Sequence, residues 1–145
     1  MNRKQYVVGF LFNEDRSRVV LIRKERPDWQ KGRFNGLGGA IEKEESPLSA
    51  MRREFEEEAG LFIKDWEEVA YIVGPTVDVI FFRSFGDHTK VKHYEESLTD
   101  EEVFLWNSVN LPMDMVWPSQ WIVGLCLDDK IRFPVRVDYK TDGER

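Results

Sequence analysis

The chain has 145 residues, of which 41% are hydrophobic and 13% aromatic, a composition typical of one globular domain rather than of a disordered segment. Its 21 Lys and Arg residues against 27 Asp and Glu residues give a net charge of −6, which argues against sequence-independent binding to a nucleic-acid polymer. The single cysteine, Cys126, excludes an intramolecular disulfide, and its place in the apolar run WIVGLCL predicts a buried, inert thiol.

The first part of the chain predicts two strands, YVVGFLF and RVVLIRK, joined by the polar turn NEDRS. VVGFLF is too short for the core of a signal peptide, and no apolar stretch reaches the roughly 18 residues that a membrane helix needs. We therefore expect a soluble, cytoplasmic protein without membrane association. The two strands are followed by a loop that Gly and Pro punctuate, RPDWQKGRFNGLGG.

A helix is predicted after this loop. Ser46 suits its N-cap, Pro47 its first position and Gly60 the position just beyond its end. One apolar stripe at helical spacing runs between these limits: Leu48, Met51, Phe55 and Ala59.

The rest of the chain predicts two strands, WEEVAYIVG and VDVIFFRSF, then a long polar connection, a short strand VFLWNSV, a helix PSQWIVGLCLDD and a strand KIRFPVRVDY. Pro134 places this last strand at a sheet edge. His88 and His93, in the polar connection, are more typical of an exposed loop than of a metal pair. The predicted fold is one α+β domain over residues 1–145, a mixed sheet with packed helices, and residues 140–145 are expected to form a flexible tail.

The segment RREFEEEAG raises a question of charge, because four glutamates fall within five positions of an already acidic protein. On a helix, Glu54, Glu57 and Glu58 share one face beside the apolar stripe, while Glu56 points away. Like charges this close need a cation, and carboxylate oxygens suit Mg²⁺ or Mn²⁺. The other interpretation is a solvated acidic face with local arginine partners.

The surrounding spacing favours the metal site. From Gly38 to Leu61 the sequence GGAIEKEESPLSAMRREFEEEAGL carries Gly39, Glu45, Arg53, Glu54, Glu57, Glu58 and Gly60 at the spacing of the Nudix box. The chain therefore resembles the Nudix hydrolases, which implies an α/β/α sandwich and hydrolysis of a phosphoanhydride bond in a nucleoside diphosphate derivative.

The resemblance also implies roles for single residues. Glu54, Glu57 and Glu58, with the carbonyl of Gly38, are expected to hold Mg²⁺, with Mn²⁺ as a possible substitute. Arg53 is expected to orient a glutamate, and Glu45 to brace the loop. The catalytic base belongs either to the box or to the region before a later strand, where Glu101 fits the spacing better than Glu102.

Outside the box, FNGLGG and MVWPSQW resemble segments of oxidised purine nucleoside triphosphatases. By that resemblance Asn35 is expected to bond the purine edge, Trp117 to stack on its face, and Arg23 or Lys24 to contact phosphates. Phe34 and Gln120 are further candidates for the binding site, although ordinary packing is the alternative for Phe34 and Trp117. Those relatives carry two aspartates where this chain has Ser119 and Gln120, so a different base preference is expected.

Three hypotheses follow. The first is Mg²⁺-dependent hydrolysis of a nucleoside triphosphate to the monophosphate and pyrophosphate, with oxidised or modified purines among the candidate bases. The second is an ADP-ribose or nucleotide-sugar pyrophosphatase, and the third is a non-catalytic nucleotide-binding module, against which the intact box argues. In each case the partner is a small nucleotide, and the protein is a monomer or a homodimer.

Overall fold

The fold is described from a computed structural model, for residues 3–91 and 101–140. Two antiparallel strands open it, β1 (Lys4–Phe12) and β2 (Arg18–Arg23), as the sequence predicts. The next segment contains more regular structure than the expected loop: a 3₁₀ turn at Asp28–Gln30 and the short strands β3 (Phe34–Asn35) and β4 (Leu37–Ala40). These short strands form because β2 and β1 pair with them.

Helix α1 (Pro47–Ala59) has the predicted limits. The Ser46 hydroxyl accepts the N–H of Ser49 at 3.1 Å, and Gly60 ends the helix in the left-handed conformation, with φ of 72°. A side chain at Gly60 would strain that conformation, which explains the choice of glycine there.

The remaining elements also follow the prediction: β5 (Glu67–Val73), β6 (Val77–Phe85), β7 (Glu102–Asn107), α2 (Ser119–Cys126) and β8 (Val135–Asp138). A 3₁₀ turn, His88–Lys90, follows β6. His93 and residues 141–145 lie outside the described residues, so the expected exposed loop there and the expected tail stay predictions.

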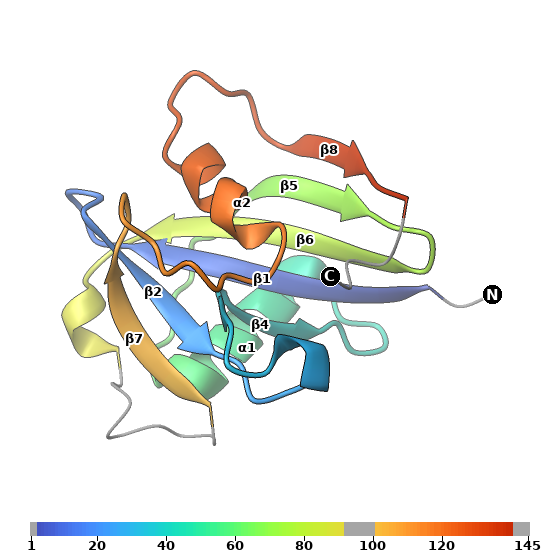
Figure 1. Cartoon of the computed structure of the whole chain (residues 1–145), viewed down its shortest axis with the longest axis horizontal. Helices are drawn as coiled ribbons and strands as arrows, with labels where there is room; N and C mark the ends of the chain where they lie inside the picture. The colour runs from blue at the N-terminus through green and yellow to red at the C-terminus, as the bar shows by residue number, and fades with distance from the viewer. Residues whose placement is uncertain (1–2, 92–100, 141–145) are drawn as a thin grey trace.

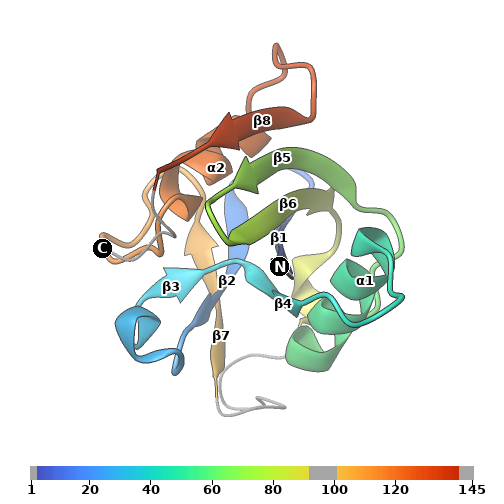
Figure 2. The same ribbon diagram turned by 90° about the vertical axis from the view of Figure 1, so that its right-hand side faces the viewer.

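The eight strands of the described residues join one mixed sheet with the order β3-β2-β1-β6-β5-β8, while β4 pairs with β1 and β7 with β2. The strand β6 runs parallel to β1, and β8 runs parallel to β5 at the edge, where Pro134 predicts it. The two helices cover opposite faces of this sheet (Figure 1), and the turned view in Figure 2 shows them on its two sides.

Strand β1 divides its side chains between two hydrophobic cores because neighbouring residues of a strand point to opposite faces. Val7 and Leu11 pack in the core under α1, whereas Phe10 and Phe12 pack in the core under α2. This arrangement is the α/β/α sandwich expected from the sequence. Neither helix in the described part of the chain is long and apolar enough to cross a membrane.

Candidate active site

Arg53 ties helix α1 to the loop before it and to strand β4. Its Nε and Nη2 donate to the two carboxylate oxygens of Glu45 at 2.8 and 3.0 Å, and Nη1 donates to Glu54 at 2.9 Å. Nη2 also donates to the carbonyl of Ala40 at 3.1 Å. These bonds, the ones to Glu45 above all, raise the pKa of Arg53 above its ordinary value. Arg53 is thus bonded to both Glu45 and Glu54, the contacts that the roles expected for these residues require.

Glu54 lies directly over the backbone of β4. A Cβ atom built on Gly39 would stand 2.5 Å from the Glu54 carboxylate, so any side chain there would displace it. Burial raises the pKa of Glu54, and the bond from Arg53 opposes that rise. The glycine of the box is thus explained by the space that this carboxylate occupies.

Glu58 lies deeper than its neighbours, with 8% of its surface exposed. Its Oε1 accepts the N–H of Gly38 at 3.0 Å. Burial raises the pKa of Glu58 to about 8; the charges of Glu54 and Glu101 raise it too, while Lys24 lowers it. The sequence places Glu58 at the margin of the buried surface, but the structure buries it, because β4 packs against α1 and the Gly38 N–H binds the Glu58 carboxylate.

Glu57 remains open to solvent, with 56% of its side chain exposed and one oxygen 3.5 Å from Nη1 of Arg53. Across residues 3–91 and 101–140, no three His, Cys, Asp or Glu side chains stand in the arrangement of a finished metal cage. The donor set nevertheless fits a hard divalent cation, because Glu54 and Glu58 supply carboxylate oxygens. Burial and nearby negative charge disfavour the charged form of both carboxyl groups, and a bound cation would relieve this.

Glu101 and Glu102 lie at the start of β7 and have different partners. Glu101 is 5% exposed and accepts the N–H of Glu25 at 2.7 Å and, more weakly, Nζ of Lys24 at 3.4 Å. Glu102 is paired with Arg23, its neighbour across the β2–β7 ladder. Of the two, Glu101 is the one whose charge reaches Glu58, so the fold brings Glu101 and Lys24 to the box.

A cavity of about 410 Å³ begins at the box and is called here the central cavity. Gly38 and Gly39 line one part of it. The residues that line it outside β4 come from distant parts of the chain and include Lys24, Arg26, Asn35, Trp117, Ser119 and Tyr139.

The aromatic part of the central cavity is built on β3. The N–H of Phe34 donates to the carbonyl of Asp114 at 2.7 Å, and the N–H of Val116 donates to the carbonyl of Phe34 at 2.8 Å. These bonds place Trp117 beside the strand that carries Asn35. Trp117 is 38% exposed, and its ring meets the ring of Tyr139 edge to face with the centroids 5.2 Å apart.

The substrate-binding residues expected from the sequence fall into two groups. Lys24, Asn35 and Trp117 line the central cavity, whereas Arg23, Phe34 and Gln120 are not among its lining residues. Arg23 is paired with Glu102, and Phe34 packs against Phe104 and Trp106 with ring centroids 5.6 and 5.1 Å away. Gln120 is exposed on α2.

The structure adds lining residues that the sequence reasoning did not select: Arg26, Trp29 and Tyr139. Tyr139 follows β8 and reaches the cavity because β8 pairs with β5. This pairing joins distant segments, so no local sequence pattern predicts it. Arg26 and Trp29 lie in a loop whose Gly and Pro residues predict irregular structure. Those residues do not predict the path of the loop, so the sequence does not show that it reaches the cavity.

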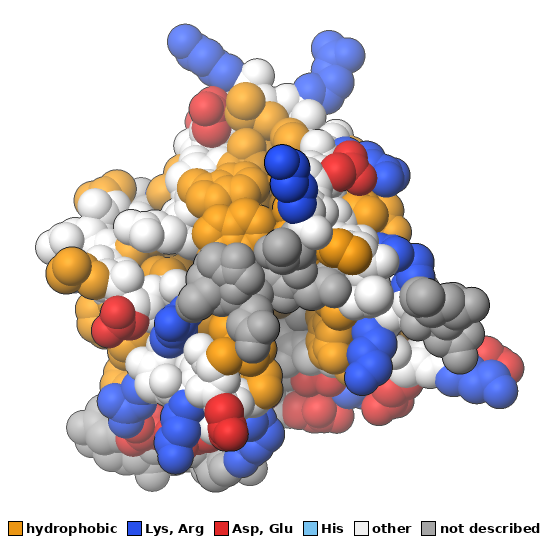
Figure 3. All heavy atoms as spheres, turned by 45° about the vertical axis from the view of Figure 1, so that its right-hand side comes forward, with side chains coloured by type: hydrophobic (Ala, Val, Ile, Leu, Met, Phe, Trp, Pro, Cys, Tyr) orange, Lys and Arg blue, Asp and Glu red, His pale blue; other side chains and the backbone are white. Residues whose placement is uncertain are grey.

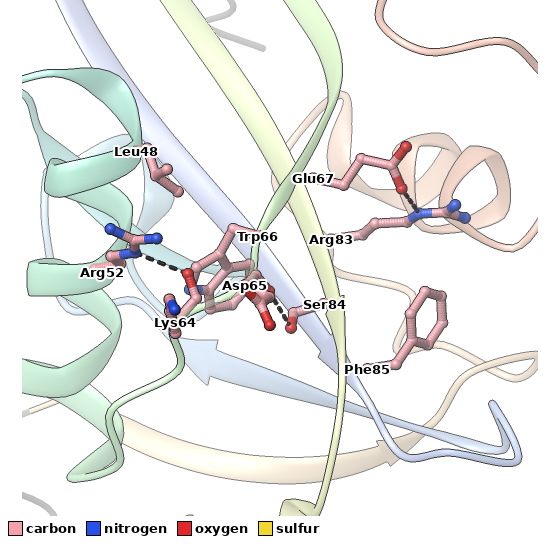
Figure 4. Close-up of a pocket in the computed structure, with 9 residues that line it drawn as sticks. All are labelled: Leu48, Arg52, Lys64, Asp65, Trp66, Glu67, Arg83, Ser84 and Phe85. Carbon is pink, nitrogen blue, oxygen red and sulfur yellow. Dashed lines mark hydrogen bonds and ion pairs between the residues drawn. The ribbon is translucent and has the colours of Figure 1, made fainter.

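A second cavity of about 370 Å³ lies at the start of α1 and along β5 and β6, and it shares no lining residue with the central cavity. Figure 4 shows that its arginines are engaged locally: Arg52 donates to the carbonyl of Lys64 at 2.7 Å, and Arg83 donates to Glu67 at 2.8 Å. On the face in Figure 3, hydrophobic side chains gather at the upper centre and a group of acidic side chains lies at the lower right.

Comparison with known proteins agrees with this geometry. The NUDIX domain family matches residues 2–118, which include the whole box and Trp117. No curated protein matches the chain.

Solved structures show the same fold. A MutT structure from work on Aliivibrio salmonicida and Vibrio cholerae is 22% identical, with a TM-score of 0.68 over 84% of this chain and 97% of that chain. MutT from Bacillus halodurans is 20% identical, with a TM-score of 0.70 over 97% and 93%. The NUDIX domain of Shewanella oneidensis NrtR, solved with ADP ribose, is 13% identical, with a TM-score of 0.71 over 87% of each chain. The chain belongs to the Nudix family, and its intact box makes it a Nudix pyrophosphohydrolase.

Proposed function

We propose that the protein hydrolyses a nucleoside triphosphate to the monophosphate and pyrophosphate, with Mg²⁺ as its cofactor and Mn²⁺ as a substitute. The observation that carries this proposal is the central cavity. It extends from Gly38 and Gly39, beside the acidic residues of the box, to the ring of Trp117 beside Asn35. A cavity with the cations Lys24 and Arg26 in its lining, the acidic box at one end and an aromatic face at the other suits a phosphate chain joined to a base.

In this proposal Glu54, Glu57 and Glu58 hold the metal, with the carbonyl of Gly38 as a further ligand. Bound Mg²⁺ polarises the phosphoryl oxygens and offsets the charge of the leaving pyrophosphate. Arg53 keeps the Glu54 carboxylate in place over Gly39.

The other groups act on the substrate and the water. Lys24 contacts a phosphate, and its bond to Glu101 keeps it at the cavity. Water attacks a phosphorus atom, the bond to the leaving pyrophosphate breaks, and a carboxylate accepts the proton of the water. Glu101 and the glutamates of the box are the candidates for this base.

One product assay tests the proposal. The protein is incubated with Mg²⁺ and with each of a panel of (deoxy)nucleoside triphosphates, oxidised purine triphosphates and ADP-ribose, and the products are separated. We expect monophosphate and pyrophosphate, and a loss of about 100-fold or more in kcat for Glu57→Gln. Glu56→Gln is the matched control, because Glu56 is exposed and lies next to Glu57 on the same helix. Intact triphosphates throughout the panel would overturn the proposal.

A second substrate class has one observation in its favour, the likeness to the NrtR NUDIX domain that was solved with ADP ribose. An ADP-ribose pyrophosphatase would release AMP and ribose phosphate from the same panel. Cleavage of ADP-ribose without cleavage of any triphosphate would replace the first proposal by this one.

A further inference from the structure

The side-chain amide of Asn35 has a fixed orientation. Asn35 is 8% exposed and lines the central cavity. Its Oδ1 lies 2.8 Å from the backbone nitrogen of Gly36. A backbone N–H only donates, so the amide atom that faces it must be the oxygen, and the other amide atom must be the NH₂ group.

Ser119 holds the same oxygen from the other side. Its side chain is fully buried at the start of α2, and its hydroxyl is hydrogen-bonded to Oδ1 of Asn35. Because the carbonyl oxygen accepts, the Ser119 hydroxyl donates. Two donors from separate segments thus fix one end of the amide, and a flip would set the NH₂ group against both.

The NH₂ group is left for a ligand. Within the part of the chain that the structure describes, no hydrogen bond from Nδ2 of Asn35 is recorded, and this nitrogen is not among the buried polar atoms that lack a partner. It therefore reaches the accessible surface of the cavity that Asn35 lines. The amide can donate to a bound base, but its acceptor is already used.

We propose that Ser119 positions Asn35 as a pure donor, so that the site selects bases with a carbonyl group at the recognised edge over bases with an exocyclic amine. This inference rests on the proposed function and specifies its substrate class as keto-base nucleotides. A carbonyl accepts the hydrogen bond that the NH₂ group is free to donate into the cavity. An exocyclic amine in that place would set its own donor against the NH₂ group of Asn35. The NH₂ group could instead donate to N1 or N7 of adenine, but both nitrogens flank the exocyclic amine, so the amine would still lie beside Asn35.

Matched pairs of substrates test the preference, because ITP differs from ATP, and UTP from CTP, at this edge. We expect kcat/KM to be at least about tenfold higher for the keto member of each pair. A binding measurement stands beside the rates: calorimetric titration with IMP and with AMP is expected to give at least about a tenfold tighter Kd for IMP.

Two substitutions test the mechanism. In Asn35→Asp the Gly36 N–H and the Ser119 hydroxyl still bind one oxygen, and the free oxygen now accepts, so the ITP-to-ATP ratio is expected to invert. Ser119→Ala is expected to reduce the ratio several-fold through KM with little change in kcat, and Ser119→Thr, which keeps the hydroxyl, to restore it. Thermal unfolding of each variant checks that it is folded.

The outcomes separate this inference from the proposed function. If no triphosphate is cleaved, the proposed function fails, and the Kd values of IMP and AMP still decide the base preference. Equal rates within each pair, or equal Kd values, overturn the inference and leave the hydrolysis standing. If Ser119→Ala lowers activity equally on ITP and ATP, Ser119 is structural only and its positioning role is overturned.

Discussion

At the scale of single residues, Arg53 is the group on which the geometry of the box depends. Its planar guanidinium binds both oxygens of Glu45 and still reaches Glu54 and the carbonyl of Ala40. A lysine keeps the charge but cannot make paired, parallel bonds. We expect Arg53→Lys to lower kcat/KM by about 10- to 100-fold, because Glu54 loses its fixed position.

Steady-state kinetics measure this change, with Arg52→Lys as the matched control. Arg52 lies on the same helix and bonds the carbonyl of Lys64 rather than a carboxylate of the box. Equal losses in the two variants would mean that Arg53 acts through helix stability and not through Glu54.

Glu58 predicts a pH dependence of stability in the metal-free protein. Burial raises its pKa from the ordinary 4.5 to about 8, so the folded state keeps a proton that the unfolded chain releases. Between these two values the free energy of unfolding must fall as the pH rises. Glu58→Gln mimics the protonated form and is expected to remove that part of the fall.

Urea unfolding in EDTA between about pH 5 and about pH 8.5 measures this slope. Glu57→Gln is the control, because its carboxylate is open to solvent and its removal should keep the slope. An unchanged slope in Glu58→Gln would show that other groups cause the fall.

At the scale of elements, the box helix carries its own limits in its sequence, and these limits are testable. Ser46→Ala removes the hydroxyl that accepts the Ser49 N–H and is expected to cost about 1 kcal/mol in the free energy of unfolding. Ser49→Ala keeps that N–H and is the matched control. Chemical denaturation measures both, and equal stability of the two variants would show that the cap contributes nothing.

The same contrast between local and distant contacts explains what the sequence predicts. The Ser46 cap, the Gly60 stop and the apolar stripe lie within α1, so its limits and the shared face of its glutamates were predictable. The strands β3 and β4 were not, because pairing with β2 and β1 makes them regular. The burial of Glu58 likewise depends on Gly38, twenty residues away.

The binding site shows this limit most clearly. Asn35 and Trp117 were selected through a resemblance, and the fold brings both to the central cavity. Tyr139 was not selected, because its place depends on the pairing of β8 with β5. The role of Ser119 was visible only as a departure from the relatives, since its partner Asn35 stands 84 positions away.

At the scale of the whole molecule, β1 couples the two cores, because its alternate residues belong to opposite faces of the sheet. The core under α2 contains Cys126, whose side chain has no exposed surface and whose thiol pKa burial raises to about 12. The thiol therefore lacks both access and its reactive thiolate form in the folded state.

As the only cysteine, Cys126 is expected to report global unfolding. With an aromatic disulfide reagent, labelling should be negligible in buffer and should rise with the same urea midpoint as the loss of far-UV circular dichroism, since both cores share β1. Phe12, which packs with Cys126 in this core, provides a further check: Phe12→Leu should move both midpoints down together. Labelling at lower urea than the loss of circular dichroism would instead mean that α2 opens by itself, and that the wall of the central cavity around Trp117 and Ser119 is able to open while the Nudix box stays folded.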